Sequence, residues 1–501
     1  MKNLRPSLNK DILSLAIPSI LANITVPLVG MADIAVAGHL PGSVSGAAFI
    51  GGITIGTMLF DLLYWNFAFL RSGTGGLTAQ AYGASLMPHP DSTVMPDPDR
   101  ASQICHILHR ALRIAIISGV ALIALQWVIL WLAFLFVDCS PEVRELATQY
   151  FKIRVWAAPA TLSLFAFKGW FIGLQDTVRP MIADLLVNGL NILLSFGLGF
   201  GLCGLPRLGF AGVAAGTVIA QWSGFLYAAI AARRRLGPGQ PRTQKRPFLF
   251  PQRSQRAATD TESGVFVSAA APSVIPGPDR ESHTPSFFRM NRDLVLRAVG
   301  MIAVYIGFTV ISARFGDTML AVSSILMKLL LVFSYFTDGF AYAGEALTGR
   351  FIGAKDPLGV KTTIRGCFLW GWGLAGAFML LYGLGGVSAF RLLTSDMTVV
   401  EAGREFIPWL LLMPLIGVPA FIWDGIFTGA TATGPMRDST LLCAVGFFAV
   451  WFGGAALASA INGSPVAGPL AIHILMAAYF THLAIRSAYL TGKRWKITCC
   501  K

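Results

Sequence analysis

The sequence predicts an all-α integral membrane protein with twelve transmembrane helices, arranged in two six-helix lobes that are related by a pseudo-twofold axis along the membrane normal. Composition is the first observation. Of 501 residues, 54% are hydrophobic and 13% are charged, whereas soluble domains carry about 25% charged residues. Twelve long apolar stretches are the second observation, and a repeat that relates the two halves is the third. Such a chain is expected to span a bilayer.

Each apolar stretch is long enough for a spanning helix, which needs about 20 residues. The first stretch, at 12–36, follows a basic N-terminus and resembles a signal peptide. It is longer than the ~7–15-residue core of such a peptide, so we expect a retained span. The predicted spans are residues 12–36, 46–83, 104–137, 146–175, 180–203 and 209–232, followed by 294–315, 318–353, 364–391, 404–431, 438–461 and 465–490.

A polar segment divides the chain into two predicted lobes. Residues 1–236 form the N-lobe, which contains a small polar insert at 85–100, and residues 294–501 form the C-lobe with its basic tail. Residues 237–293 are rich in Pro, Ser and Arg and lack apolar periodicity. This composition predicts a disordered basic linker.

Lys and Arg are concentrated at both chain ends, in the linker and in the even-numbered connections between spans. Because basic residues favour the cytoplasmic side, both termini and the linker are predicted to be cytoplasmic. The protein is then a multi-pass protein of the cell inner (cytoplasmic) membrane. The same rule accounts for the net charge of +14, so we expect membrane lipid and no nucleic acid among the partners.

Two segments occur in both halves in the same order. FLRSGTGGLTAQAYGA at 69–84 corresponds to GFAYAGEALTGRFIGA at 339–354, and Gly169–Gly173 corresponds to Gly425–Gly429. Six crossings return the chain to its starting side, so both copies enter the membrane in the same direction and face each other across a central cleft. This geometry favours alternating access of a midplane site to the two sides of the membrane.

Asp33 is predicted to lie late in the first span, where its flanking residues are apolar and supply no charge partner. An ionisable group at such a depth costs ~2.5–3.5 kcal/mol on insertion scales and usually serves a function. Burial favours the neutral carboxyl group, which allows reversible proton binding. Alternatively, its oxygens and an amide such as that of Asn191 would hold Na⁺. Pro18 and Pro27 in the same span each remove a backbone hydrogen bond and predict a helix that can bend.

Asp338 and Glu345 are seven residues apart in span 8 with Tyr342 between them, so all three lie on one helical face. This stripe would attract an organic cation through charge and cation–π contact. The alternative is that one of the two carboxylates pairs with Lys328 or Arg350.

Other polar residues also fall within predicted spans, where the charges are mainly acidic. For Arg71, Lys168 and Asp424 we expect structural ion pairs or positions near the membrane interface. Further candidates for the wall of a substrate cavity lie in span 2: Asp61, Trp65 and Asn66.

Five segments carry a resemblance to a known family. They are PLVGMADIAVAGHLPG in span 1, WNFAFLRSGTGGLTAQAYGA in span 2, GWFIGLQDTVRPM in span 4, YFTDGFAYAGEALTGRFIGA in span 8 and WDGIFTGATATGPMRDS in span 10. These segments resemble the multidrug and toxic compound extrusion (MATE) transporters, most closely their bacterial DinF-like branch. The resemblance covers essentially the whole chain apart from the two polar inserts. It implies twelve helices in two lobes and export of organic, often cationic, compounds in exchange for H⁺ or Na⁺.

The resemblance also assigns roles to residues of this sequence. Asp33 falls on the family's span-1 acid and Pro18 on the proline associated with bending, while Asn188 and Asn191 fall on its Asn positions in span 5. Ser195 stands where many members have Asp. With one carboxylate fewer, a multi-carboxylate Na⁺ site is disfavoured and a proton carried by Asp33 is favoured.

On these grounds we expect a secondary active antiporter that exports organic, cationic or amphipathic compounds by alternating access in exchange for H⁺, or alternatively Na⁺ bound near Asp33. We expect a monomer. We also expect no cofactor, no other metal and no enzyme activity, because the seven Cys show no CxxC spacing and the seven His are scattered. The rival is a lipid-linked oligosaccharide flippase of the same superfamily architecture, which would need a more cationic cleft to hold a pyrophosphate.

Overall fold

The computed structural model describes residues 6–39, 46–86, 98–136, 139–202, 204–236, 287–315, 317–393 and 397–498. In these residues every regular element is a helix, and twelve helical segments are long and apolar enough to cross a membrane. They follow the predicted spans in order, from Leu8–Asp33 to Gly468–Gly492. The predicted all-α membrane fold is therefore confirmed.

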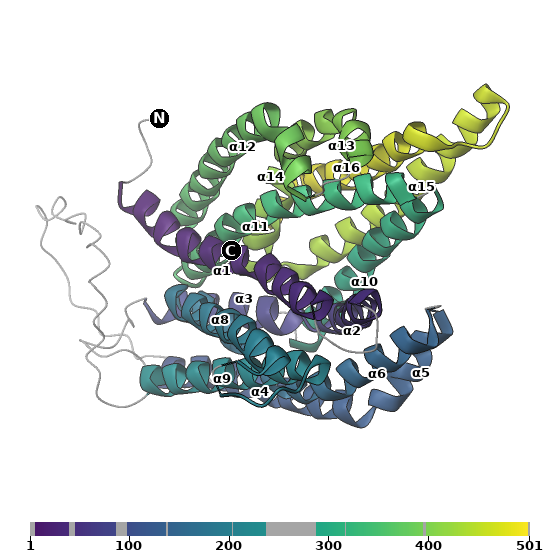
Figure 1. Ribbon diagram of the computed structural model, residues 1–501. Helices are drawn as coiled ribbons and strands as arrows, with labels where there is room; N and C mark the ends of the chain where they lie inside the picture. The colour runs from purple at the N-terminus through teal and green to yellow at the C-terminus, as the bar shows by residue number, and fades with distance from the viewer. Residues whose placement is uncertain are drawn as a thin grey trace, which may run out of the picture.

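The first half of the chain forms the N-lobe, drawn from purple to teal in Figure 1. Three of its predicted spans are interrupted. A turn at Phe67 and Ala68 separates α2 from α3, Leu125 separates α4 from α5, and the short helix η1 separates α6 from α7. The elements are α1 (Pro6–Gly38), α2 (Gly46–Asn66), α3 (Phe69–Ser85), α4 (Pro98–Ala124), α5 (Gln126–Phe136), α6 (Pro141–Arg154), η1 (Val155–Ala157), α7 (Ala158–Gly173), α8 (Val178–Phe200) and α9 (Phe210–Leu236).

The second half forms the C-lobe, drawn from green to yellow in Figure 1. Its helices α11 and α12 have 37 residues each. This corresponds to about 55 Å of helix, so both are long enough to extend beyond the hydrocarbon core. The elements are α10 (Phe287–Ser312), η2 (Ala313–Phe315), α11 (Asp317–Gly353), α12 (Pro357–Leu393), α13 (Met397–Arg404), α14 (Ile407–Gly429), α15 (Thr433–Asn462), α16 (Gly468–Gly492) and α17 (Trp495–Thr498).

The boundaries of the two polar segments differ from those that the sequence predicts. α10 begins at Phe287, so residues 287–293, expected in the linker, are helical, and α4 begins at Pro98, inside the expected polar insert. Hydropathy locates only the apolar part of a spanning helix, whereas polar turns can continue the helix into water. The rest of the insert, residues 87–97, and the rest of the linker, residues 237–286, lie outside the described residues.

The sequence repeat recurs as a packing pattern within each lobe. In the N-lobe α7 crosses α3 so closely that a Cβ on Gly169 would lie 2.1 Å from the carbonyl oxygen of Arg71. In the C-lobe α14 crosses α11, and a Cβ on Gly425 would lie 1.9 Å from the carbonyl oxygen of Ala341. Glycine at each crossing lets two backbones approach with no side chain between them. The lobes therefore share one internal arrangement.

The lobes meet where α3 and α11 end. A Cβ on Gly83 would lie 1.9 Å from the carbonyl oxygen of Arg350, and a Cβ on Gly353 would lie 2.0 Å from that of Gln80. Gly83 and Gly353 occupy equivalent places in the repeat, and so do Gln80 and Arg350. Each lobe thus offers a matching patch to the other, as in a twofold interface. The lobes are tightly packed on the side of the molecule where α1 begins.

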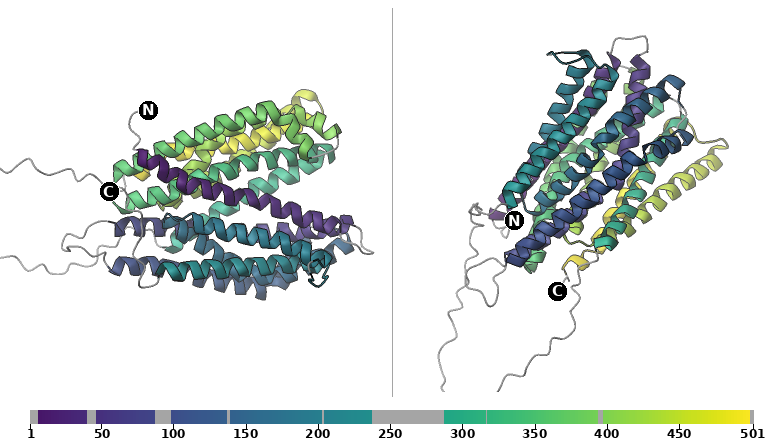
Figure 2. Two further views of the ribbon diagram at one scale, coloured as in Figure 1. Left: turned by 60° about the vertical axis from the view of Figure 1, so that its left-hand side comes forward. Right: turned by 90° about the horizontal axis from the view of Figure 1, so that it is seen from below.

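α1 contributes to both lobes. Near its start, Leu8, Ile12 and Leu15 are buried in the large hydrophobic cluster of the C-lobe. Near its end, Val36 is buried in an N-lobe cluster with Phe49. Figure 2 shows α1 running obliquely between the two layers of helices. A displacement of one lobe relative to the other therefore acts on α1.

Candidate functional site

Asp33 lies late in α1 with 6% of its surface exposed. The hydroxyl group of Ser195 on α8 donates a hydrogen bond to its Oδ1 at 2.8 Å. Ser195 is itself fully buried, and α8 packs against both α1 and α9. The structure thus joins two residues that are 162 positions apart in the chain and that the sequence assigns to one site.

Asn188 and Asn191 share a face of α8 with Ser195, because spacings of three and four residues align side chains along a helix. Nδ2 of Asn188 donates to Oγ1 of Thr25 on α1 at 2.5 Å. Nδ2 of Asn191 donates to Oγ1 of Thr217 on α9 at 2.8 Å, while its Oδ1 is buried with no hydrogen-bond partner among the described residues. This face therefore links α1 to α9 and leaves one amide oxygen available.

Arg154, at the end of α6, belongs to this region although the sequence did not single it out. Its Nη1 donates to the hydroxyl group of Tyr150 at 3.0 Å and to Oγ1 of Thr57 at 3.3 Å. Its guanidinium group interacts electrostatically with Asp33 and Asp61. The signal that would have found it is a basic residue inside a predicted span.

The oxygen atoms near Asp33 decide which ions the site can bind. Among the described residues, no three His, Cys, Asp or Glu side chains cluster as a metal ion would require. Hard cations prefer several oxygen ligands and negative charge. Here the candidates are one carboxylate, the hydroxyl group of Ser195 and the amide oxygen of Asn191. This donor set carries a single negative charge.

α1 remains one helix across Pro18 and Pro27. Because Pro18 has no N–H group, the carbonyl oxygen of Ser14 lacks its usual helical donor. The hydroxyl group of Thr177, next to the start of α8, donates to that oxygen at 3.4 Å. This replacement bond ties the predicted bending point of α1 to the N-lobe.

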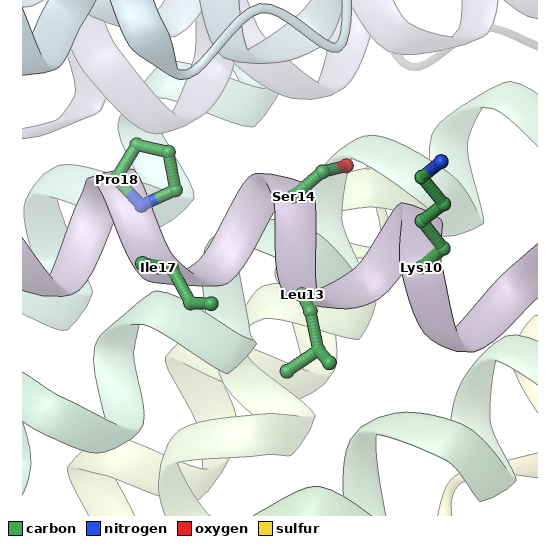
Figure 3. A pocket seen from close by; sticks show the side chains of 5 residues that line it. All are labelled: Lys10, Leu13, Ser14, Ile17 and Pro18. Atoms are coloured by element: carbon green, nitrogen blue, oxygen red, sulfur yellow. The ribbon is translucent and has the colours of Figure 1, made fainter.

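An open groove of about 520 Å³ runs along the same part of α1, and the side chains that line it are Lys10, Leu13, Ser14, Ile17 and Pro18. Figure 3 shows Lys10 and Ser14 projecting from one side of the helix, with Leu13 and Ile17 on the other. Pro18 precedes Asp33 by about 22 Å along the helix axis, at 1.5 Å per residue. The groove is therefore separate from the buried carboxyl group.

The predicted stripe on α11 is formed, and a cation from the other lobe occupies it. Nη1 of Arg71, on α3, donates to Oε2 of Glu345 at 3.3 Å. Its guanidinium group lies over the ring of Tyr342, 4.5 Å from the centroid, and interacts electrostatically with Asp338. Glu345 is 1% exposed, so this contact is largely shielded from water.

Neither Lys328 nor Arg350, the two partners suggested by the sequence, forms an ion pair with these carboxylates among the described residues. Arg350 reaches across the lobe boundary, where its Nη1 donates to Oε1 of Gln175 at 3.0 Å. Among the described residues, no ion pair joins Lys328 to Asp338 or Glu345; the ion pair of Glu345 is with Arg71. The reason is tertiary, because α3 approaches α11 closely enough to supply the base itself.

Of the three span-2 candidates, two lie at the lobe boundary. The ring of Trp65 meets that of Tyr305 on α10 edge-on, with centroids 5.3 Å apart, and Asp61 interacts electrostatically with Tyr305. Asn66 instead donates to the carbonyl oxygen of Leu62 in its own helix at 2.7 Å. The aromatic pair brings α2 of the N-lobe against α10 of the C-lobe.

The remaining charges singled out in the spans form ion pairs. Nζ of Lys168 lies 2.5 Å from Oδ1 of Asp184. Asp424 pairs with Arg297, at 2.5 Å, and with Arg486. Together with the two N-lobe arginines described above, these bases correct the expectation that the charges within the spans are mainly acidic. The expectation was wrong because it left out Arg154, Arg297 and Arg486, which all lie inside apolar spans.

Comparison with known proteins places these features in a family. The MatE family model matches residues 18–89, 98–196 and 295–450. The chain is 32% identical over 441 residues to the DNA damage-inducible protein F of Escherichia coli (strain K12), covering 88% of this chain and 85% of that protein. It is 26% identical over 219 residues to the "Probable multidrug resistance protein NorM" of Thermotoga maritima, covering 44% of this chain and 43% of that protein.

Solved structures share the fold at lower sequence identity. A MATE structure in the straight conformation matches with a TM-score of 0.75 and 16% identity, covering 99% of this chain and 98% of that one. A MOP superfamily transporter from Pyrococcus furiosus matches with a TM-score of 0.74 and 17% identity, covering 99% and 97% of the two chains. With its twelve membrane-spanning helices, the chain is therefore a multi-pass membrane protein that belongs to the MATE family of transporters, in its DinF-like branch.

Proposed function

We propose that the protein is a secondary active antiporter of the cell inner (cytoplasmic) membrane, which exports organic, cationic or amphipathic compounds in exchange for H⁺ by alternating access. One observation carries this proposal: the buried carboxyl group of Asp33, bonded to Ser195, lies on a helix that packs into both lobes. In this proposal the transporter acts as a monomer, with both termini and the linker in the cytoplasm, as the distribution of basic residues predicts.

Protonation of Asp33 would change how the end of α1 interacts with the N-lobe. The ionised carboxylate accepts the hydrogen bond of Ser195 and is attracted to Arg154. A neutral carboxyl group loses most of that attraction and can donate a hydrogen bond of its own. Because the beginning of α1 is packed into the C-lobe, a shift of its end alters how the lobes meet. Ion binding then favours one orientation of the central cleft over the other.

A proton suits this site better than Na⁺. The oxygens near Asp33 are those of one carboxylate, the hydroxyl group of Ser195 and the amide group of Asn191, with a single negative charge. A sodium ion would need further oxygen ligands to replace its hydration shell. A proton needs only one carboxylate oxygen. Na⁺ bound near Asp33 remains the alternative coupling ion.

The test is export of a fluorescent organic cation from proteoliposomes under separately imposed H⁺ and Na⁺ gradients. We expect an H⁺ gradient to drive substrate movement and a Na⁺ gradient at constant pH to leave it at the rate of protein-free vesicles. Vesicles with no added ion gradient serve as the control. Substrate movement that neither gradient accelerates would contradict the antiporter.

Ser195→Asp should extend the ion range of the site. A second carboxylate beside Asp33 doubles the local negative charge and places two carboxylate oxygens near the amide of Asn191 in place of one hydroxyl oxygen. We expect this variant to show Na⁺-driven export in the same vesicles, whereas Ser195→Ala should show none. If Ser195→Asp is well folded and still indifferent to Na⁺, the number of carboxylates does not select the ion.

A lipid-linked oligosaccharide flippase is the second candidate, favoured by the arginines that lie inside the spans. Arginine is well suited to bind a pyrophosphate. Three of the arginines already pair with carboxylates, however: Arg71 with Glu345, and Arg297 and Arg486 with Asp424. We therefore expect a labelled polyprenyl-pyrophosphate oligosaccharide to cross these vesicles no faster than it crosses protein-free ones. Faster crossing would favour the flippase.

A further inference from the structure

Among the positions at which α3 and α11 differ in the repeat, two meet each other. In the alignment of residues 69–84 with 339–354, Arg71 corresponds to Ala341 and Gly75 to Glu345. Glu345 packs directly on α3, where a Cβ on Gly75 would lie 2.1 Å from its Oε1. The two matching helices therefore differ where the N-lobe supplies a base and the C-lobe supplies an acid.

The surroundings of Arg71 are those of a site for an organic cation. Its guanidinium group lies on the ring of Tyr342 and bonds to Glu345, with Asp338 on the same helical face. An aromatic ring flanked by carboxylates binds quaternary and delocalised cations through charge and cation–π contact. We refer to Asp338, Tyr342 and Glu345 as the α11 subsite. In this structure a side chain of the protein fills it.

The occupant and the subsite belong to different lobes. Arg71 is carried by α3 of the N-lobe and the subsite by α11 of the C-lobe, so separation of the lobes on this side withdraws the guanidinium group. Glu345, which is 1% exposed, would then lose its hydrogen-bonded base and keep only the weaker attraction of Arg297. Removing the bonded partner of a buried carboxylate is unfavourable. A cation that enters from solution can restore the balance.

We propose that Arg71 is an internal competitor for cationic substrate, which vacates the α11 subsite when the lobes separate and displaces the bound substrate when they close. This inference rests on the proposed export function and assigns the cationic substrates of that proposal to one subsite, which Arg71 fills in this structure. Closure inserts one positive charge as another leaves. The net charge of the subsite therefore stays the same through the cycle. Bound substrate dissociates because Arg71 takes its place.

The test is equilibrium binding of tetraphenylphosphonium to the purified full-length protein in lipid nanodiscs, with no ion gradient. Arg71→Ala empties the subsite, so we expect it to bind the probe about tenfold more tightly than the wild type. Methylguanidinium should compete with the probe in this variant, because it replaces the missing side chain. Adding Glu345→Gln to Arg71→Ala should abolish the gain in affinity.

Arg350→Ala is the matched control. Arg350 also bonds across the lobe boundary, to Gln175, and its removal leaves the α11 subsite filled. We expect its affinity for the probe to stay within about twofold of the wild type. An equal gain in both variants would show that loosened lobes, not a vacated subsite, raise affinity, and would overturn the inference. Unchanged or weaker binding by folded Arg71→Ala would overturn it as well.

A second variant covers the case in which Arg71→Ala does not fold. Arg71→Gln is smaller than arginine, carries no charge and can still donate a hydrogen bond to Glu345, so it should shift affinity in the same direction. The binding assay also separates the two proposals. If the wild type shows ion-driven export but neither variant binds the probe more tightly, the export function stands and the role of Arg71 fails.

Discussion

Asp33→Asn should reduce ion-driven export from proteoliposomes to the rate of protein-free vesicles. Asparagine has nearly the same shape as aspartate, and its amide oxygen can still accept the hydrogen bond from Ser195 that the carboxylate accepts at 2.8 Å. It cannot take up or release a proton near neutral pH. The variant should therefore keep its fold and lose its response to the gradient. The measurement is substrate release under an imposed H⁺ gradient, with thermal unfolding of the same sample as a check on folding.

Asp61→Asn is the matched control for this variant. Asp61 is another N-lobe acid that interacts with Arg154, yet it is exposed and lies on α2 rather than on α1. We expect it to retain ion-driven export, with changes confined to substrate affinity. Wild-type export by Asp33→Asn would remove Asp33 from the coupling mechanism. Complete loss in both variants would mean that the shared contact with Arg154, and not proton binding at Asp33, is what export requires.

Gly83→Val should also abolish export, but for a steric reason. A Cβ at this position would lie 1.9 Å from the carbonyl oxygen of Arg350, and a backbone atom in a helix cannot move aside as the end of a flexible side chain can. Because α3 and α11 belong to different lobes, the added atoms push the lobes apart at this end. Overpacked contacts cost about 1–3 kcal/mol, which is enough to favour the separated arrangement. The lobes should then fail to close on the side where α1 begins.

The measurement is export together with the reactivity of a cysteine introduced near the ends of α3 and α11, which becomes accessible when the lobes separate. Gly425→Ala is one control, since its Cβ would lie 1.9 Å from the Ala341 carbonyl oxygen within a single lobe. It should lower the melting temperature without exposing the cysteine. Gly373→Val is the second control, because a Cβ there meets nothing within 4 Å. Normal export by Gly83→Val would show that close contact here is not needed.

Several features of the protein could be predicted because they are local properties of the chain. Whether a segment enters the membrane depends on the hydropathy of that segment, so the twelve spans were predictable. A carboxyl group in an apolar span is costly wherever its helix lies, which distinguished Asp33. The repeat of 69–84 at 339–354 predicted matching lobes, and the paired glycine crossings follow that alignment.

Contacts between helices that are far apart in the chain could not be predicted from the sequence. For the acids of α11, spacing in the sequence identifies only bases of the same helix, such as Lys328 and Arg350. The base that pairs with Glu345 is 274 positions away. That Arg154 interacts with Asp33 was equally unpredictable, since it depends on how α6 packs in the N-lobe. A spacing rule relates residues within one helix and says nothing about a second helix.

The amino-acid sequence by itself determined that this chain spans the membrane twelve times in two similar halves, that it resembles MATE transporters, and that Asp33 is an acid in an apolar setting. Only the tertiary structure decided that Ser195 bonds to Asp33, that α1 belongs to both lobes, and that Arg71 fills the stripe on α11. The physical reason is that these contacts depend on the rotation of each helix about its axis and on the approach of the two lobes. Both are set by packing among residues that lie far apart in the chain.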